Sequence, residues 1–131
     1  MPCSPAKSVA YSDSASGVYI STEMFRKLDI EEAMKNKAKK IPATPVGEIV
    51  AKGEAEIGFQ QIAELKPVAG IDVVGPLPAD LQKITVFSAG VASVAKEPEA
   101  GRTLIRFLTS SVASAEIVRC GMEPIPQHAT N

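Results

Sequence analysis

The sequence is poor in aromatic residues: it has no tryptophan, and aromatic side chains make up 5% of its 131 residues. This scarcity argues against stacking platforms for nucleic-acid bases and against aromatic clamps for sugars. Charge gives no reason to expect such partners either. The formal net charge is −1, whereas anionic polymers and membranes attract strongly basic surfaces. We therefore expect no nucleic-acid partner.

Signatures of metal, cofactor and nucleophile chemistry are also missing. The single histidine, His128, lies in a polar tail, which leaves no basis for a His/Cys metal site. The sequence has no P-loop, no GxGxxG and no GxSxG pattern. No histidine is near Ser12–Asp13 in the sequence, so nucleophilic catalysis is unsupported. We predict no metal, no cofactor and no catalytic residue.

Long apolar runs are absent as well. No stretch approaches the roughly 20 residues that a membrane helix needs, and the start "MPCSPAKS" lacks the apolar core of an export signal. We expect a cytoplasmic protein if the chain is complete, or a chain without its natural beginning. Cys3 and Cys120 lie near opposite ends, and both a disulfide and two free thiols remain open.

What the sequence does contain is a regular alternation of short β-type runs and helical segments, in a chain long enough for a real core. Helices are predicted at about 16–28, 30–37 and 45–53. The predicted strands are Lys7–Asp13, Ala38–Ala43, Ala55–Phe59, Ile71–Pro78 and, longest of all, Lys83–Ala95.

The end of the sequence is predicted to be helical. Pro98 suits a first helical position, and Ser110 or Ser111 can cap a last helix that ends at Cys120 before Gly121. The first of these helices carries an apolar face for burial, formed by Leu104, Ile105, Phe107 and Leu108.

Alternating β and α elements predict an α/β fold: three layers, α/β/α, with a mostly parallel sheet. In such sheets ligands bind beyond the carboxyl ends of the strands. Three loops qualify, at 12–17, 42–46 and 60–61.

In the first loop, Ser14 or Ser16 precedes a helix, and Gly17 permits close approach of the backbone to a ligand. Free N–H groups in a first helical turn favour an anion, and serine hydroxyls add neutral donors. Ordinary helix capping explains the same residues.

The other two loops are also open to two interpretations. Ala43 and Thr44 can present N–H and hydroxyl donors to the same crevice, or form a turn punctuated by proline. Two glutamines follow the third strand, and a glutamine there can bond a ligand oxygen or cap backbone groups.

Taken together, "SVAYSDSASGVY", "PVGEIVAKGEAEIGFQQIAEL", "IDVVGPLPADLQKITVFSAGVA" and "KEPEAGRTLIRFLTSSVASAEIVRCGMEP" resemble one family. They look like the second half of molybdate-type periplasmic substrate-binding proteins of ABC transporters, with the type 2 periplasmic-binding fold. The resemblance implies a single α/β domain over 1–131. Its second-lobe core and return strand would span 8–95, its C-terminal helices 96–122, and a tail 123–131.

The resemblance also implies a function: binding a small oxyanion or carboxylate in a cleft, next to a transporter permease in the periplasm. Its ligand-binding positions fall on Ser14, Ser16, Gly17, Ala43, Thr44 and Gln61. Molybdate binders often carry tyrosine at the last of these positions, so Gln61 favours a different anion. Only one wall of the cleft is present, which predicts a homodimer through the surface left uncovered.

Two alternatives accompany this prediction. One branch resembling this family is aconitate isomerase, an enzyme that moves a proton within a tricarboxylate. Such an enzyme needs a base, for which Asp13 and Glu48 are the candidates in the loops. The other alternative is a truncated lobe with no activity of its own.

Overall fold

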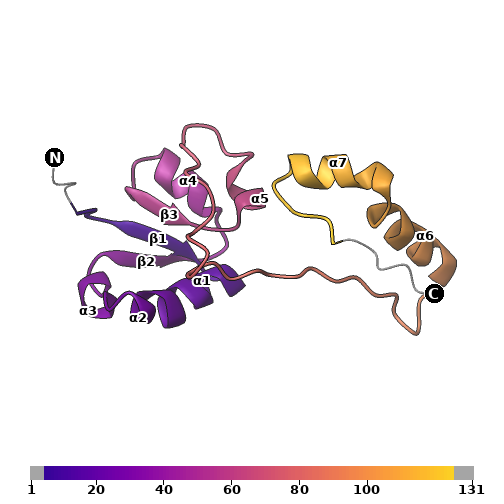
Figure 1. Cartoon of the computed structure of the whole chain (residues 1–131), viewed down its shortest axis with the longest axis horizontal. Coiled ribbons are helices and arrows are strands. Elements are labelled where there is room, and N and C mark those ends of the chain that lie inside the picture. The colour runs from indigo at the N-terminus through magenta and orange to yellow at the C-terminus, as the bar shows by residue number, and fades with distance from the viewer. Residues whose placement is uncertain (1–4, 126–131) are drawn as a thin grey trace. The chain divides into compact units, whose positions relative to one another are not determined.

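A computed structural model describes residues 5–125, and within it the chain forms two compact units that divide between Lys83 and Ile84 (Figure 1). We call residues 5–83 the sheet unit and residues 84–125 the hairpin unit. Among the described residues, the sheet unit holds three strands and six short helical segments, and the hairpin unit holds two longer helices.

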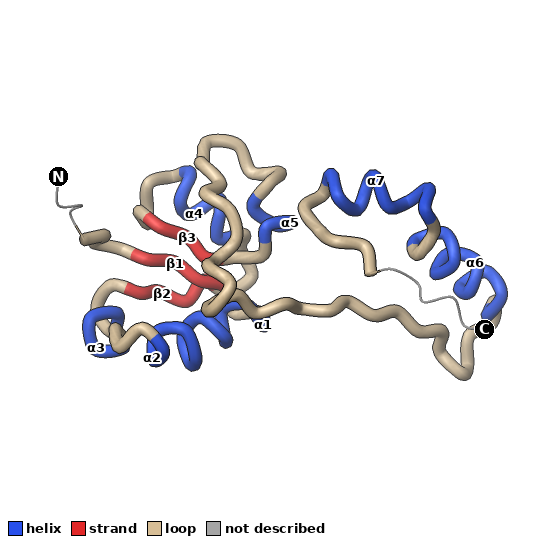
Figure 2. Tube along the Cα trace, viewed as in Figure 1, coloured by secondary structure: helices blue, strands red, loops and turns tan. Residues whose placement is uncertain are grey.

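The sheet is built from β1 (Val9–Ser12), β2 (Ala38–Ile41) and β3 (Ile57–Phe59), all parallel, in the order β2-β1-β3. All three lie within strands that the sequence predicts. The register pairs Ser12 with Ile41 and Tyr11 with Phe59, so the carboxyl ends of the three strands meet at one edge (Figure 2).

One face of the sheet is covered by a continuous helix, close to the helix predicted at 16–28. It comprises α1 (Ala15–Tyr19), a π-helical turn η1 (Ile20–Met24) and α2 (Phe25–Lys27), and Asp29 ends it in the left-handed conformation. After it comes α3 (Glu31–Met34). Tyr11 of β1 meets Phe25 edge-on, with ring centroids 6.3 Å apart. The buried side chains of this layer are Tyr19, Ile20, Met24 and Phe25.

The opposite face carries α4 (Val46–Ala51), where a helix is predicted, and α5 (Ile62–Leu65), which the sequence analysis missed. Val46 is fully buried in a cluster with Ala10, Ile41 and Ala55. Gly58 lets α4 approach β3, because a Cβ there would lie 2.8 Å from Val46 and 2.7 Å from Val50.

Helices cover both faces because of the strand order. The chain moves from β1 to β2 in one direction, and then passes over β1 to reach β3 in the other. Right-handed crossovers in opposite directions place their helices on opposite faces. The predicted three-layer α/β arrangement with a parallel sheet is confirmed.

The sheet unit ends in a short segment that packs against η1 and its neighbours. Leu77 and Leu81 join the buried cluster of this face, and the Tyr19 hydroxyl donates to the Leu81 carbonyl. Lys83 pairs with Glu23 at 2.7 Å and lies 5.0 Å from the centre of the Tyr19 ring. These contacts fix the chain to the helix layer just before it leaves the unit.

Two predicted strands, Ile71–Pro78 and Lys83–Ala95, are wrong: both segments are loops (Figure 2). A strand exists only where its N–H and C=O groups find a neighbouring strand. Residues 84–91 form no backbone hydrogen bond with any described residue. Pro76 and Pro78 have no N–H to contribute to the earlier segment.

The hairpin unit consists of α6 (Pro98–Leu108) and α7 (Ser111–Arg119), close to the predicted helices. Pro98 stands in the first turn of α6, and the Ser110 hydroxyl caps α7 by accepting from the Ala113 N–H. The face predicted for burial is not buried: Leu104, Phe107 and Leu108 are exposed. Among the described residues, no helix has the length and apolar character to cross a membrane.

Candidate ligand-binding edge

The three loops that the sequence singles out all leave the carboxyl edge of the sheet. Asp13 follows β1, Pro42 follows β2 and Gln60 follows β3, each leading directly into a helix. β1 and β3 are neighbours in the sheet, but the loops after them lead to helices on opposite faces, and a crevice forms where neighbouring loops diverge in this way. The first loop therefore occupies the position in this fold best suited to a ligand.

Three serine hydroxyls form a triangle at the end of β1. The Ser12 hydroxyl lies 2.7 Å from that of Ser14 and 3.0 Å from that of Ser16, and the last two are 3.1 Å apart. Ser12 is 4% exposed, Ser16 is half-buried and Ser14 is exposed. The sequence analysis placed Ser12 in the first loop but did not include it among the ligand-binding residues, although its position at the end of the strand was a usable signal.

The triangle differs from an ordinary helix cap. Ser14 is the N-cap residue of α1, yet within the described chain its side chain makes no capping bond to a first-turn N–H. Only the N–H of Val18 reaches the Ser14 carbonyl, as the first intrahelical bond. The earlier N–H groups of the turn therefore remain available, as free donors at a helix start generally do.

The packing of the helix against β1 requires a glycine at position 17. A Cβ at this position would lie 1.6 Å from the Ser12 carbonyl oxygen and 2.6 Å from the Ser12 carbonyl carbon. The glycine therefore lets the first turn of the helix lie directly on the end of β1. This close approach brings Ser16 to Ser12.

The second loop contains backbone strain. Ala43 has φ +54°, a left-handed conformation that costs an L-residue with a Cβ about 1–2 kcal/mol. Pro45 is the N-cap residue of α4 and has no hydroxyl, while Thr44 beside it is half-buried. The Thr44 hydroxyl forms no hydrogen bond with any described residue, so it remains available as a donor.

The two glutamines of the third loop have different roles. The Gln60 side chain accepts from the Val46 N–H at 2.8 Å and so caps α4. Gln61 is the N-cap residue of α5 through its backbone, and within residues 5–125 its half-buried side chain has no hydrogen-bond partner. The capping role predicted for one glutamine falls to Gln60, and Gln61 keeps a free amide.

The candidate bases do not lie together. Asp13 is exposed beside the serine triangle, whereas Glu48 lines a hollow of about 510 Å³ on the surface of α4 and α5. A second hollow of about 210 Å³ lies beside the amino ends of β1 and β2. None of the six predicted ligand-binding residues lines either hollow. Among the described residues, no three His, Cys, Asp or Glu side chains gather as metal ligands would.

Comparison with known proteins agrees with the fold. The sequence matches the bacterial extracellular solute-binding proteins over residues 4–123. The chain belongs to this family. It is also 49% identical over 121 residues to an aconitate isomerase from Pseudomonas sp., a match covering 92% of this chain and 46% of that relative. The chain thus spans about half the length of this relative. No solved structure matches.

The comparisons confirm the resemblance stated from the sequence, including its branch of aconitate isomerases. Cys3 and His128 lie outside the described residues, and Cys120 is exposed. A disulfide and two free thiols stay the two alternatives for the cysteines, and the six ligand-binding residues stay a prediction.

Proposed function

We propose that the sheet unit forms one wall of a binding site for a small anion, most suitably a carboxylate. In this proposal the chain serves as a solute-binding component beside an ABC-type permease in the periplasm. The observation that carries the proposal is the serine triangle without a capping bond. Ser14 and Ser16 offer hydroxyls at a helix start whose first N–H groups are not occupied by a side chain.

The chemistry of this edge suits an oxyanion. The hydroxyls of Ser14 and Ser16 can exchange their mutual hydrogen bond for bonds to a ligand, while Ser12 stays buried behind them. Thr44 and Gln61 add a hydroxyl and an amide from the neighbouring loops. These are neutral donors, which bind a charged oxygen through hydrogen bonds about twice as strong as those between neutral groups.

A thermal-shift panel tests the proposal. The ligands are molybdate, tungstate, sulfate, phosphate, citrate and trans-aconitate, each titrated to millimolar concentration. A ligand at 100 times its Kd stabilises the folded state by about 2.7 kcal/mol, which raises Tm by several degrees. We expect citrate or trans-aconitate to give the largest rise. If no anion changes Tm, the chain is a lobe without binding activity of its own.

Two variants locate the site. Ser16→Ala and Gln61→Ala should each weaken binding by about tenfold, because each removes one hydrogen bond to a charged ligand. The matched control is Ser21→Ala in the same helix, whose hydroxyl donates to the Gly17 carbonyl instead. Equal affinities in all three variants and the unaltered chain would place the ligand elsewhere.

A second function is supported by the relative named aconitate isomerase at 49% identity. An isomerase of a tricarboxylate removes a proton from one carbon and returns it to another, so a positioned base is required. Asp13 is the better placed candidate, because it adjoins Ser12 and Ser14. Absorbance at the conjugated double bond follows conversion of trans- to cis-aconitate. Loss of conversion in Asp13→Asn, but not in Asp72→Asn, would support the enzyme.

The sheet unit supplies one wall of the proposed site, and the homodimer predicted from the sequence supplies the other. We propose a second copy of this chain, in a homodimer.

A further inference from the structure

The helix over residues 15–27 contains one turn that is wider than the rest. In η1 the N–H of Phe25 donates to the carbonyl of Ile20, five residues earlier, whereas an α-helix joins residues four apart. Single π-helical turns of this kind are rare, and they occur frequently at functional sites. The wide turn separates the serine triangle, at the start of the helix, from the part of the helix that follows.

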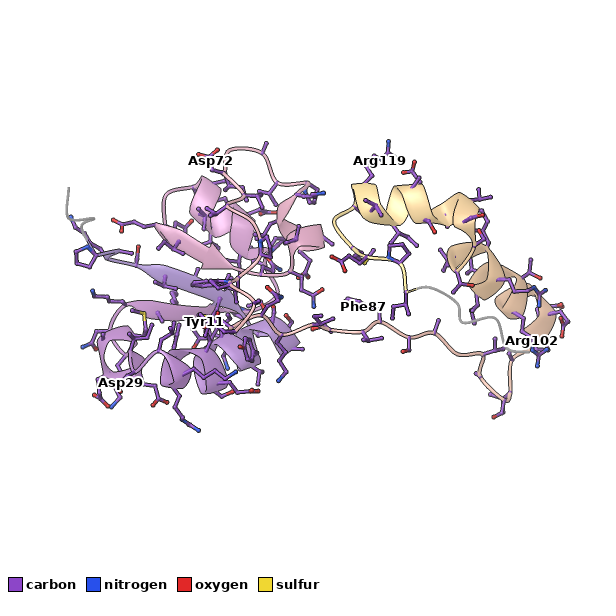
Figure 3. The ribbon with its side chains drawn as sticks, in the orientation of Figure 1. Tyr11, Asp29, Asp72, Phe87, Arg102 and Arg119 are labelled. Atoms are coloured by element: carbon purple, nitrogen blue, oxygen red, sulfur yellow. The ribbon has the colours of Figure 1, made fainter. Side chains whose placement is uncertain are left out.

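The wide turn lets both parts of the helix contact β1. Gly17 lies directly on Ser12, and Phe25 lies edge-on to Tyr11, with ring centroids 6.3 Å apart (Figure 3). In a plain α-helix, two residues eight positions apart point in directions about 80° apart. The wide turn takes up one extra residue, so these two positions lie as residues seven apart do, within about 20° of each other. Both parts of the helix therefore rest on β1 only while the turn is wide.

The last segment of the sheet unit contacts the helix on both sides of this change. We call residues 77–83 the strap. Tyr19, just before the wide turn, donates its hydroxyl to the Leu81 carbonyl. Glu23, inside the turn, pairs with Lys83 at 2.7 Å, and the Lys83 ammonium lies 5.0 Å from the centre of the Tyr19 ring. One lysine of the strap thus contacts two side chains whose relative rotation about the helix axis is set by the turn.

A second arrangement of the helix is available without unfolding it. If the turn narrows to an α turn, the part of the helix before it rotates by about 100° relative to the part after it. Phe25 is held in the buried cluster, so the part that rotates is the start of the helix, and Gly17 and Ser16 leave Ser12. Tyr19 loses its burial and its bond to the strap, which makes this arrangement the minor of two discrete states.

We propose that the strap and the serine triangle are coupled through this turn. The bound strap holds the turn wide and the triangle assembled, whereas release of the strap lets the turn narrow and separates Ser16 from Ser12. An anion bound to the assembled triangle also strengthens the hold of the strap, because coupling between two sites is reciprocal. Only this effect of an anion rests on the proposed function, since the coupling itself exists without ligand.

NMR relaxation dispersion on the whole chain without ligand measures the minor state, because such exchange falls in the microsecond-to-millisecond range. Lys83→Met should raise the minor population about threefold, the effect of losing one ion pair between partly exposed side chains. The exchange should appear at the amides of residues 16–24. The Overhauser contact between the β protons of Ser12 and Ser16 should weaken in parallel.

The matched control is Lys27→Met. The Lys27 ammonium lies 6.0 Å from the centre of the same Tyr19 ring, but this lysine belongs to the helix and not to the strap. The control should leave the minor population unchanged. Equal effects in the two variants would mean that charge near Tyr19 controls the turn, and the coupling to the strap would be excluded.

Two other results without ligand contradict the coupling. Absent exchange at residues 16–24 in Lys83→Met means that the turn does not respond to the strap. Exchange that extends equally to the amides of α4, on the opposite face of the sheet, means that the variant loses stability throughout the sheet unit.

Citrate and trans-aconitate separate the coupling from the proposed function. An anion that raises Tm should reduce the exchange at residues 16–24 and slow amide exchange at Leu81, whose N–H donates to the Pro78 carbonyl within the strap. A rise in Tm with unchanged exchange contradicts the coupling and leaves the binding site intact. If no anion raises Tm, the proposed function fails, and the measurement without ligand alone decides the coupling.

Discussion

The sheet unit and the hairpin unit are held together in different ways. The sheet unit buries two clusters, one on each face of its sheet, with side chains supplied by strands and helices far apart in the sequence. Among the described residues of the hairpin unit, Ala113 is the only hydrophobic residue that is buried. Its helices depend on local signals, such as Pro98 and the Ser110 cap. Local signals are thus enough to form a helix, but they do not supply a core.

Replacing a glycine by alanine should give the largest difference in stability between the two units. Gly17→Ala places a methyl group within bonding distance of the Ser12 carbonyl, so α1 must move off the sheet. We expect a loss of about 4 kcal/mol in the free energy of unfolding, near the upper end for one substitution. Urea denaturation measures it. Gly90→Ala in the hairpin unit meets nothing within 4 Å and should change stability by less than about 0.5 kcal/mol.

A similar loss in the two glycine variants would mean that residues 84–95 are packed, contrary to their exposure. A small loss for Gly17→Ala would mean that the helix tolerates displacement from Ser12. The serine triangle would then lack the close approach that forms it.

Replacing a valine by alanine should give the next largest difference in stability between the two units. Val46→Ala removes two methyl groups from a side chain that is fully buried between α4 and the sheet, and should cost about 2 kcal/mol through lost burial and a cavity. Val94→Ala, at a site 89% exposed, should cost less than about 0.5 kcal/mol. Thermal denaturation of both variants checks this, and equal costs would contradict the different packing of the two units.

Prediction from the sequence succeeded where the pattern itself determines the structure. Val9 to Ser12 alternate between the two faces of the sheet, and the helix after them has apolar residues at helical spacing, so both elements are recognisable. The segments at 71–78 and 83–95 have equally strong β patterns. They fail as strands because their hydrogen-bond partners are not supplied by the described chain. The short helix α5 was missed because four residues carry too little periodicity.

The candidate site was predictable in position but not in detail. Parallel strands put their carboxyl ends at one edge, so the three loops could be selected without coordinates. The division of roles between Gln60 and Gln61 depends on the direction of each side chain relative to α4, which the sequence does not specify. The left-handed backbone of Ala43 could not be predicted from the sequence either, because glycine or asparagine is the usual signal for this conformation.

The next prediction concerns the segment where the sheet unit ends. Tyr19→Phe removes the hydroxyl that donates to the Leu81 carbonyl and should cost about 1 kcal/mol. Faster amide exchange at Leu81 and Gln82 would localise the effect, since both N–H groups donate to the Pro78 carbonyl in this segment. Tyr11→Phe is the control, because the Tyr11 ring packs edge-on against Phe25 and its hydroxyl has no partner among the described residues. Identical exchange rates in both variants would show that Leu81 is held by other contacts.

The smallest expected effect is a pKa change at the boundary between the units. The hydrogen bond from Lys83 lowers the pKa of Glu23 below its usual value. Desolvation opposes this, and the nearby charges of Lys83 and Lys27 add smaller lowering contributions. Because the folded-state pKa is lower than the unfolded one, the associated stability is present at neutral pH. It is lost as the pH falls through the folded-state pKa, in the acid range below about 4.3.

Carbon NMR of the Glu23 carboxyl as a function of pH measures this directly. Lys83→Met should raise the Glu23 pKa towards its usual value, and Lys27→Met should raise it less, because Lys27 makes the smallest contribution. An unchanged pKa in Lys83→Met would mean that Lys83 does not contact Glu23 in solution. The chain would then leave the sheet unit before residue 83, and the boundary between the packed and unpacked regions would move towards Leu81, the last residue joined to the buried cluster.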